Sequence, residues 1–400
     1  FNSLQVKRST NRINSLGYFQ EKFEVEQKPG SAPDRIVLEA NVEEKPTGEL
    51  QLSAGFSSIE SFIFQASVQQ RNFRGRGQTV GVSGSYSRYS KSAELSFTEP
   101  YVFDKNISLG VNLYRRDYNS FNFYNSSRNT TYQQSTTGIQ LRAGVALTEY
   151  LTGVGSYTLN FDDVSLGNEF YSLDSNGARV CDPLLAGRYL CDAVGKRTSS
   201  IVGLSLIYDT LDNRMRPSRG RILTISGDFA GLGGSVKYAR INARAAQYWP
   251  LGKGFIFSIS GEGGAIKALQ KRYDGSGSRI EDVRLTDRFY LGEPQLRGFD
   301  IRGVGPRVLR KNYIDSIDVD TDGDGKPDSG DGIPDTPSLT RSNWTDDAIG
   351  GRFYYQARAE LEIPLGSGAK EMGLRPSIFV DAGAVWSIRQ PKMNDPDCSG

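Results

Sequence analysis

The sequence predicts an all-β fold, a transmembrane antiparallel β-barrel preceded by the C-terminal part of a small α/β domain. Three observations lead to this prediction. Apolar and polar residues alternate along many short segments, the links between these segments are short and long in turn, and no run approaches the roughly 18 apolar residues of a membrane-spanning helix. Because turn residues recur at regular spacing, we expect about 13 strands.

The alternation begins at Glu49. Leu50, Leu52 and Ala54 lie on one face of the first predicted strand, and Glu49 and Gln51 lie on the other. A soluble sandwich also alternates, but its polar face meets bulk water. Here the polar face is rich in Gly, Ser, Gln and Arg, which suits lipid outside and a water-filled lumen inside. The same period of two returns in residues 62–69, 79–83, 107–113 and 239–245.

The links between predicted strands differ in length from one side of the sheet to the other. All the long links follow odd-numbered strands, as expected of long outer loops opposite short periplasmic turns. The short links are residues 72–77, 101–106, 148–150, 250–254 and 364–373, and the long links are residues 119–136, 162–197 and 270–352.

An odd number of strands does not close a bacterial barrel, and an open edge in lipid leaves backbone groups unpaired. The sequence also stops in a predicted loop after Trp386. We therefore expect the barrel to be truncated before its final strands. A miscount by one strand is the alternative explanation of the odd number.

The first residues follow another pattern. Leu4, Val6, Ile13 and Leu16 recur at roughly helical spacing, and Gly17 suits the end of a helix. Two strand-like runs follow, at residues 18–27 and 35–42, joined by a Pro-Gly-Ser turn. A helix and two strands are too little for a whole domain. We expect residues 1–47 to be the end of an α/β domain and residues 48–400 to be the barrel.

The composition excludes several functions. The chain has no histidine, the commonest general base and metal ligand, and no other convergent set of nucleophile and base is evident. An enzyme is therefore not expected, and no cofactor is required. Because the formal net charge is only +2 and no basic stripe stands out, nucleic acid is not an expected partner.

Two of the three cysteines, Cys181 and Cys191, lie close together in one long link. In an oxidising compartment this spacing predicts a local disulfide, and two unpaired thiols are the alternative. Cys398 has no evident partner in this sequence.

An acidic insertion, residues 318–335, lies within the 270–352 link. Its aspartates follow the calcium-loop spacing D-x-D-x-D-G, which places hard oxygen ligands around a glycine turn. Position 12 of the motif is Asp rather than the usual Glu, and no flanking helices are evident. Bound Ca²⁺ in this outer loop and a solvated acidic loop both remain open. The five candidate ligands are Asp320, Asp322, Asp324, Asp328 and Asp331.

The same link carries the segment Leu296-Arg297-Gly298-Phe299. Later strands bear unexplained charges, among them Glu362 and Asp381. An arginine beside a glycine, with strand carboxylates facing it, suggests a loop locked inside the barrel. The alternative is that these are ordinary lumen charges, solvated and of little energetic consequence.

Several segments together resemble the BamA family of outer-membrane assembly factors, in which polypeptide-transport-associated (POTRA) domains precede a barrel. The resemblance covers nearly the whole chain. Leu296 departs from the family, which more often has Val or Ile there. The segments that carry the resemblance are residues 12–19, 68–73, 93–101, 289–292, 296–299, 305–306 and 379–386.

The resemblance implies roles for these residues. Residues 1–47 would end the last POTRA domain, and the complete barrel would have about 16 strands. The motif arginine would contact an acidic residue on each of two late strands, here Glu362 and Asp381. The period of two is consistent with this, because it turns both carboxylates toward the lumen. A guanidinium could hold such carboxylates through paired charge-assisted bonds, which a lysine could not do.

The resemblance further implies a protein of the bacterial outer membrane, with its POTRA part in the periplasm. It would fold and insert unfolded β-barrel clients together with accessory lipoproteins, in contact with outer-membrane lipid. The first strand, residues 48–56, would form a lateral gate and pair with incoming strands. A relative that exports a soluble partner or assembles autotransporters, and a passive porin, are the alternatives. The gate residues would be Leu50, Leu52, Ser53, Ala54 and Gly55.

Overall fold

The computed structural model describes most of residues 25–389, together with residues 6, 9–10, 13 and 17–20. The chain divides into two compact units, residues 1–114 and 115–400. Within the described part of the chain, no helix is both long and apolar enough to cross a membrane. The gaps after residue 25 are 33–34, 58–60, 125–126, 174–176, 215, 274–276, 278, 312, 315–335, 338–343, 366–374 and 390–400.

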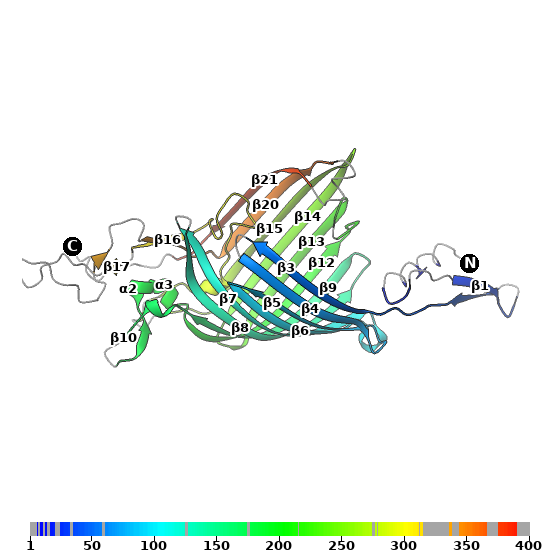
Figure 1. Cartoon of the computed structure of the whole chain (residues 1–400), viewed down its shortest axis with the longest axis horizontal. Helices are drawn as coiled ribbons and strands as arrows, with labels where there is room; N and C mark the ends of the chain where they lie inside the picture. Colours follow the sequence, from blue (N-terminus) through cyan, green and yellow to red (C-terminus); the bar gives the residue numbers. More distant parts are fainter. Residues whose placement is uncertain are drawn as a thin grey trace, which may run out of the picture. The chain divides into compact units, whose positions relative to one another are not determined.

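Thirteen strands form one sheet in which strands adjacent along the chain are also adjacent in space (Figure 1). This confirms the prediction of an all-β antiparallel fold with about 13 strands. Short additional strands lie within the long links and pair only locally. The order in the sheet is β21-β20-β15-β14-β13-β12-β9-β8-β7-β6-β5-β4-β3.

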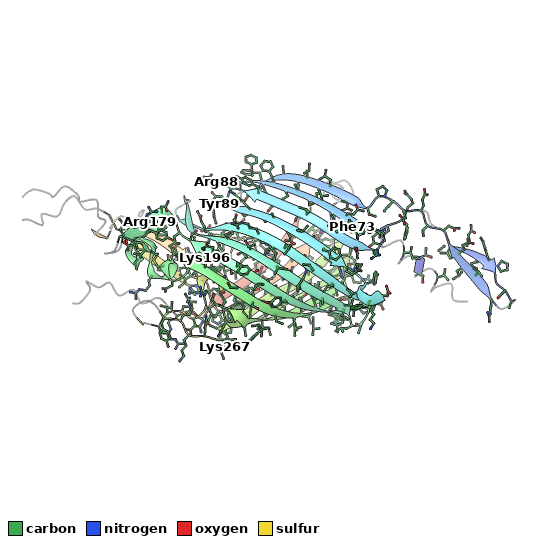
Figure 2. All side chains as sticks on the ribbon, turned by 90° about the horizontal axis from the view of Figure 1, so that it is seen from below. Phe73, Arg88, Tyr89, Arg179, Lys196 and Lys267 are labelled. Carbon is green, nitrogen blue, oxygen red and sulfur yellow. A yellow bond between two sulfur atoms is a disulfide. The ribbon has the colours of Figure 1, made fainter. Side chains whose placement is uncertain are left out.

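In the first unit, β1 and β2 form an isolated hairpin, and β3 to β6 pair in sequence. Figure 2 shows Phe73, which ends β4, and Arg88 with Tyr89, which follow β5, at opposite ends of the strands. The elements are β1 (Val25–Pro29), β2 (Ile36–Ala40), β3 (Gly48–Ser57), β4 (Ser61–Phe73), β5 (Gln78–Ser87), β6 (Ser90–Glu99), η1 (Val102–Asp104) and β7 (Ile107–Tyr124), in which the division between units falls.

The second unit continues the sheet with long strands. They are β8 (Ser127–Ala146), β9 (Leu151–Ser165), β12 (Gly195–Asp209), β13 (Gly220–Gly234), β14 (Tyr238–Gly252), β15 (Phe255–Ala268), β20 (Phe353–Glu362) and β21 (Ser377–Trp386). The link after β9 contains η2 (Asn168–Phe170), β10 (Tyr171–Leu173), β11 (Arg179–Cys181), α2 (Pro183–Ala186) and α3 (Arg188–Cys191). The link after β15 contains η3 (Leu285–Asp287), β16 (Arg307–Lys311), β17 (Tyr313–Ile314), β18 (Thr336–Pro337) and β19 (Trp344–Ala348).

The two faces of the sheet differ in polarity, because the strand period of two sorts the side chains. On β21, Ile378 and Val380 are 65% and 71% exposed, whereas the side chain of the neighbouring Asp381 is only 4% exposed. We call these two sides the apolar face and the polar face. The described part of the 270–352 loop packs on the polar face, so the apolar face of these strands is left for lipid.

One expected link proved wrong. Residues 119–136 were expected to form a long loop, but β7 runs to Tyr124 and β8 begins at Ser127. The segment is rich in Asn, Ser and Thr, which favours a loop when polarity alone is considered. The Thr and Tyr residues in this segment favour extended backbone, which polarity alone does not reveal.

In the N-terminal region, Val6 and Ile13 are the described members of the expected helical set, and both are helical. The strands β1 and β2 overlap the two strand-like runs. The assignment of residues 1–47 to the end of an α/β domain stays a prediction.

Candidate functional site

The described part of the 270–352 loop folds back on itself beside β20 and β21. Phe289 and Gly351 exchange two backbone hydrogen bonds of 2.9 Å, and the amide of Val304 donates to the carbonyl of Leu291 at 3.0 Å. Between these ties the amide of Leu296 donates to the carbonyl of Gly292 at 2.8 Å. The loop thus presents a compact tip, residues 291–304, to the polar face of the strands.

Leucine side chains seat this tip on the sheet. Leu291 and Leu296 are each 1% exposed, and they form a cluster with Val385 of β21. Val304 and Tyr354 pack against the same cluster. Burying two leucines contributes roughly 1.5–3 kcal/mol each, so the motif leucine holds the tip by packing.

Arg297 makes the predicted contact with Asp381. Its Nε lies 2.9 Å from Oδ2 of Asp381 and its Nη2 lies 3.0 Å from Oδ1, a paired arrangement of two charge-assisted bonds. The backbone amide of Arg297 also points to Oδ2, at 3.4 Å. The guanidinium carbon lies 3.1 Å from the ring centroid of Phe379, so the cation also stacks on an aromatic face.

A second arginine, missed by the sequence reasoning, completes this contact. Arg358 of β20 lies opposite Asp381 in the strand register, and its Nε and Nη2 donate to the same carboxylate at 2.8 Å and 3.1 Å. Its Nη2 also donates to the carbonyl of Gln295 at 2.9 Å, and the side-chain amide of Gln356 donates to that carbonyl too. We call Arg297, Arg358 and Asp381 the tip anchor.

The prediction that Arg297 also contacts Glu362 was wrong. The structure places Glu360 beside Arg297, with Nη2 and Oε2 3.5 Å apart, whereas Glu362 pairs with Arg375 at 3.5 Å. Both glutamates point to the same face, so the period of two could not separate them. Register does, because Asp381 is opposite Arg358, and Glu362 lies two further positions along β20 from Glu360.

The other two motif residues differ in role. Gly298 has a φ of +84°, and a Cβ built there would meet no atom within 4 Å. Glycine is therefore favoured by backbone conformation rather than by space. Phe299 is 50% exposed, and its role stays a prediction.

The outer part of the loop packs against the link that follows β9. A disulfide joins Cys181 to Cys191, with Cα atoms 5.5 Å apart. Residues of both links form one hydrophobic cluster, in which Leu190, Leu285 and Ile349 are at most 2% exposed. This packing covers the loop where it leaves the strands.

A partly buried arginine and a partly buried tyrosine hold the backbone of this outer part. Arg288 donates to the carbonyls of Val283 and Ile349 at 3.0 Å and 2.9 Å, and burial lowers the pKa of its guanidinium. The hydroxyl of Tyr290 donates to the carbonyl of Leu285 at 2.9 Å, and burial raises the pKa of this phenol. Each of these side chains satisfies carbonyls that no strand partner reaches, which fixes the loop without regular secondary structure.

The expected gate residues, Leu50 to Gly55, all lie in β3. This strand stands at one end of the sheet order and pairs with β4 along its whole length, from Gly48 opposite Gln70 to Ser57 opposite Ser61. Their role in a gate stays a prediction. The five calcium-candidate aspartates, residues 320–331, lie outside the described residues, as does Cys398.

Comparison with known proteins gives this arrangement a family. Residues 72–399 match the Omp85 superfamily domain, which is well over half of the chain. The chain belongs to the Omp85 superfamily. Proteins of this superfamily are outer-membrane proteins that act in assembly or transport and are not enzymes, so the sequence prediction of a non-enzymatic protein is confirmed.

Among its Omp85 relatives are proteins named "Outer membrane protein assembly factor BamA". That of Neorickettsia risticii is 26% identical over 384 residues, 96% of this chain and 43% of the relative. That of Neisseria meningitidis serogroup B is 24% identical over 414 residues, 100% of this chain and 45% of the relative. The "Sorting and assembly machinery component 50 homolog" of Bos taurus is 27% identical over 242 residues, 59% of this chain and 44% of the relative.

The chain thus spans less than half the length of these curated relatives. Its structure is similar to that of BamA from Haemophilus ducreyi lacking POTRA domains 1–3, with a TM-score of 0.66 and 22% identity. The match covers 95% of this chain and 65% of that one, and it shows a shared fold.

Proposed function

We propose that this Omp85 chain belongs to a central subunit that folds and inserts β-barrel proteins into the bacterial outer membrane. The observation that carries the proposal is the tip anchor. Arg297 and Arg358 close on one carboxylate that is 4% exposed, and so fix a long loop to the polar face of β20 and β21. A pore for passive diffusion needs no such fixed loop, whereas a protein that guides folding needs a defined surface.

The relatives support the same proposal. Proteins named as assembly factors match nearly the whole chain, including the strands that carry the tip anchor. In this proposal residues 1–47 end a periplasmic POTRA domain and residues 48–400 belong to the barrel. Unfolded barrel clients, accessory lipoproteins and outer-membrane lipid are then its partners.

Client folding would begin at β3. A strand at the end of a sheet offers backbone donors and acceptors as a template, and an incoming strand can extend the sheet by pairing with it. Leu52 and Ala54 would face lipid, and Ser53 and Gly55 would face water, so a paired client strand would inherit the correct orientation.

The proposal is tested by reconstituting the full-length protein in liposomes and following the folding of an unfolded β-barrel client. We expect the parent to accelerate folding and Arg297→Ala to reduce that acceleration by about tenfold or more, because the loss of a charge-assisted pair exceeds about 1.4 kcal/mol. The matched control is Arg214→Ala, which removes an arginine whose side chain is 83% exposed and paired only with Asp209 among its described contacts.

Two results would contradict the proposal. No acceleration by the parent, with ion leakage as its only activity, would indicate a passive pore. Passage of a soluble protein across the membrane without client insertion would instead indicate an exporter of the same superfamily.

A further inference from the structure

A second charged contact holds the 270–352 loop at a different place. Asp287 ends η3, before the tip, and its Oδ2 lies 2.8 Å from Nη1 of Arg197 in β12. Nε of the same guanidinium lies 3.0 Å from Oδ2 of Asp162 in β9. The three side chains are only 4–10% exposed, so this ion triad is more buried than the tip anchor.

Side chains of the neighbouring strands orient Arg197 for this contact. Arg197 and Asp162 are direct partners in the register of β12 and β9. The other oxygen of Asp162 accepts from Thr136 at 2.6 Å and from Gln134 at 3.2 Å. Asp162 therefore orients the guanidinium before the loop arrives, and leaves its Nη1 edge for a carboxylate from the loop.

The backbone of Asp287 is held as well. Nη2 of Arg240, on β14, donates to the carbonyl of Asp287 at 2.9 Å. The guanidinium of Arg240 also lies 5.7 Å from the ring centroid of Phe289, two residues further along the loop. Side chains of two strands, Arg197 of β12 and Arg240 of β14, thus contact one short segment of the loop.

We propose that Arg197, oriented by Asp162, is a positioning residue that holds the base of the loop through Asp287, independently of Arg297. We call Asp162, Arg197 and Asp287 the base anchor. Its polarity is the reverse of that at the tip, since the loop supplies the acid at the base and the arginine at the tip. The inference rests on the proposed function, in which the loop must be held in place for clients to fold.

Two anchors on one loop predict separable effects on local opening. The amides of Asp287 and Phe289 are bonded at the base, to Arg284 and Gly351, and the amide of Leu296 is bonded at the tip. Hydrogen exchange reports the opening of each region. In the full-length protein in lipid nanodiscs, we expect Asp287→Asn to speed exchange at the base amides by about tenfold or more, because it removes the charge-assisted contact between the loop and Arg197, which keeps only Asp162 as its partner.

Arg297→Ala should show the converse pattern, with faster exchange at Leu296 and little change at Asp287. Arg197→Lys is the stricter variant. A single ammonium nitrogen cannot occupy both the Nε and the Nη1 positions that meet the two carboxylates, so the charge remains but the base opens. Asp287→Glu retains the carboxylate and should recover most of the protection.

The matched control is Glu149→Gln, which removes the same charge from an exposed position in the turn between β8 and β9, outside the loop. We expect its exchange and its client folding to equal those of the parent. In the liposome assay, Asp287→Asn should slow client folding while Asp287→Glu restores it. If Asp287 had only a general structural role, faster exchange in Asp287→Asn would not be confined to the base amides while Asp287→Glu restored client folding.

Unchanged exchange at the base amides in both Asp287→Asn and Arg197→Lys would overturn the inference. The inference would also be overturned if Asp287→Asn and Arg297→Ala each sped exchange equally at the base and at the tip, because this would indicate a single anchor. If the parent itself folds no clients, the proposed function fails, but the exchange measurements still decide whether the base anchor exists. Variants that do not fold are recognised by loss of the protected strand amides, and Arg197→Lys, which keeps the charge, then carries the test.

Discussion

At the scale of single residues, Asp381 is the point on which the tip anchor depends. Two guanidinium groups, from the loop and from the neighbouring strand, each approach its carboxylate with two nitrogens. With Glu360 beside Arg297, the group has two positive and two negative side chains, so the buried carboxylate is fully compensated. Such a group is held firmly by its geometry but is sensitive to the loss of any one charge.

We therefore predict that Asp381→Asn lowers the free energy of unfolding by about 3–5 kcal/mol, because two arginines lose their shared partner. Glu362→Gln, on the same face, removes only a 3.5 Å pair with Arg375 whose side chains are 31% and 39% exposed. It should cost about 0–1 kcal/mol. Urea unfolding of both variants in lipid measures the difference, and equal losses would show that the two carboxylates are equivalent.

At the scale of elements, the loop and β21 are fitted to each other by small residues. A Cβ built on Gly383 would lie 2.6 Å from Cδ2 of Leu291 and 3.0 Å from the carbonyl oxygen of Tyr355. Gly305 of the loop would in turn meet Cβ of Val385 at 2.9 Å. Each glycine lets the opposite element approach closely, so the tip is seated by shape as well as by charge.

Gly383→Ala should therefore displace Leu291 and loosen the tip, at a cost of about 1–3 kcal/mol from overpacking. The matched control is Gly155→Ala in β9, where an added Cβ would meet only Cδ2 of Leu204, at 3.9 Å. Hydrogen exchange at Leu296 measures the effect on the tip. If exchange at Leu296 is faster in Gly155→Ala, or is unchanged in Gly383→Ala, close packing is not what holds the loop on the sheet.

The sequence predicted the elements better than their long-range contacts. A period of two is a local property, so it placed the strands and turned Asp381 to the correct face. It could not distinguish Glu360 from Glu362, since positions two apart share a face and only register separates them. Arg358 could have been found by pairing β20 with β21.

The base anchor was out of reach of sequence reasoning for a related reason. Asp162, Arg197 and Asp287 lie far apart in the chain, and an isolated charge in a polar segment resembles any solvated charge. Asp287 reaches Arg197 of β12 only because of the way the loop folds over the sheet. The prediction of a long loop at residues 119–136 failed for another reason. A polar sequence can form either a loop or a strand, and polarity alone does not distinguish them.

At the scale of the whole molecule, the alternation of apolar and polar residues along the strands suits lipid on one face of the sheet and water on the other. On β12, Leu204 and Leu206 are 69% and 51% exposed, whereas Arg197 on the opposite face of the same strand is buried under the loop. A protein in water would lose stability by exposing such leucines in a continuous face. In lipid, the same face is buried in hydrocarbon and the polar face carries the loop and its anchors.

This orientation makes a prediction whose sign separates a membrane protein from a soluble one. Leu204→Arg places a charge on the apolar face near the middle of β12, and in lipid it should cost about 2–4 kcal/mol. Ser205→Arg, at the next position, points to the polar face, where Asp228 is close in the register, and should be tolerated. Folding of both variants into phosphatidylcholine vesicles measures the difference. If the apolar face met water, Leu204→Arg would be neutral or would improve solubility, so a wild-type folding yield for this variant would contradict the membrane orientation.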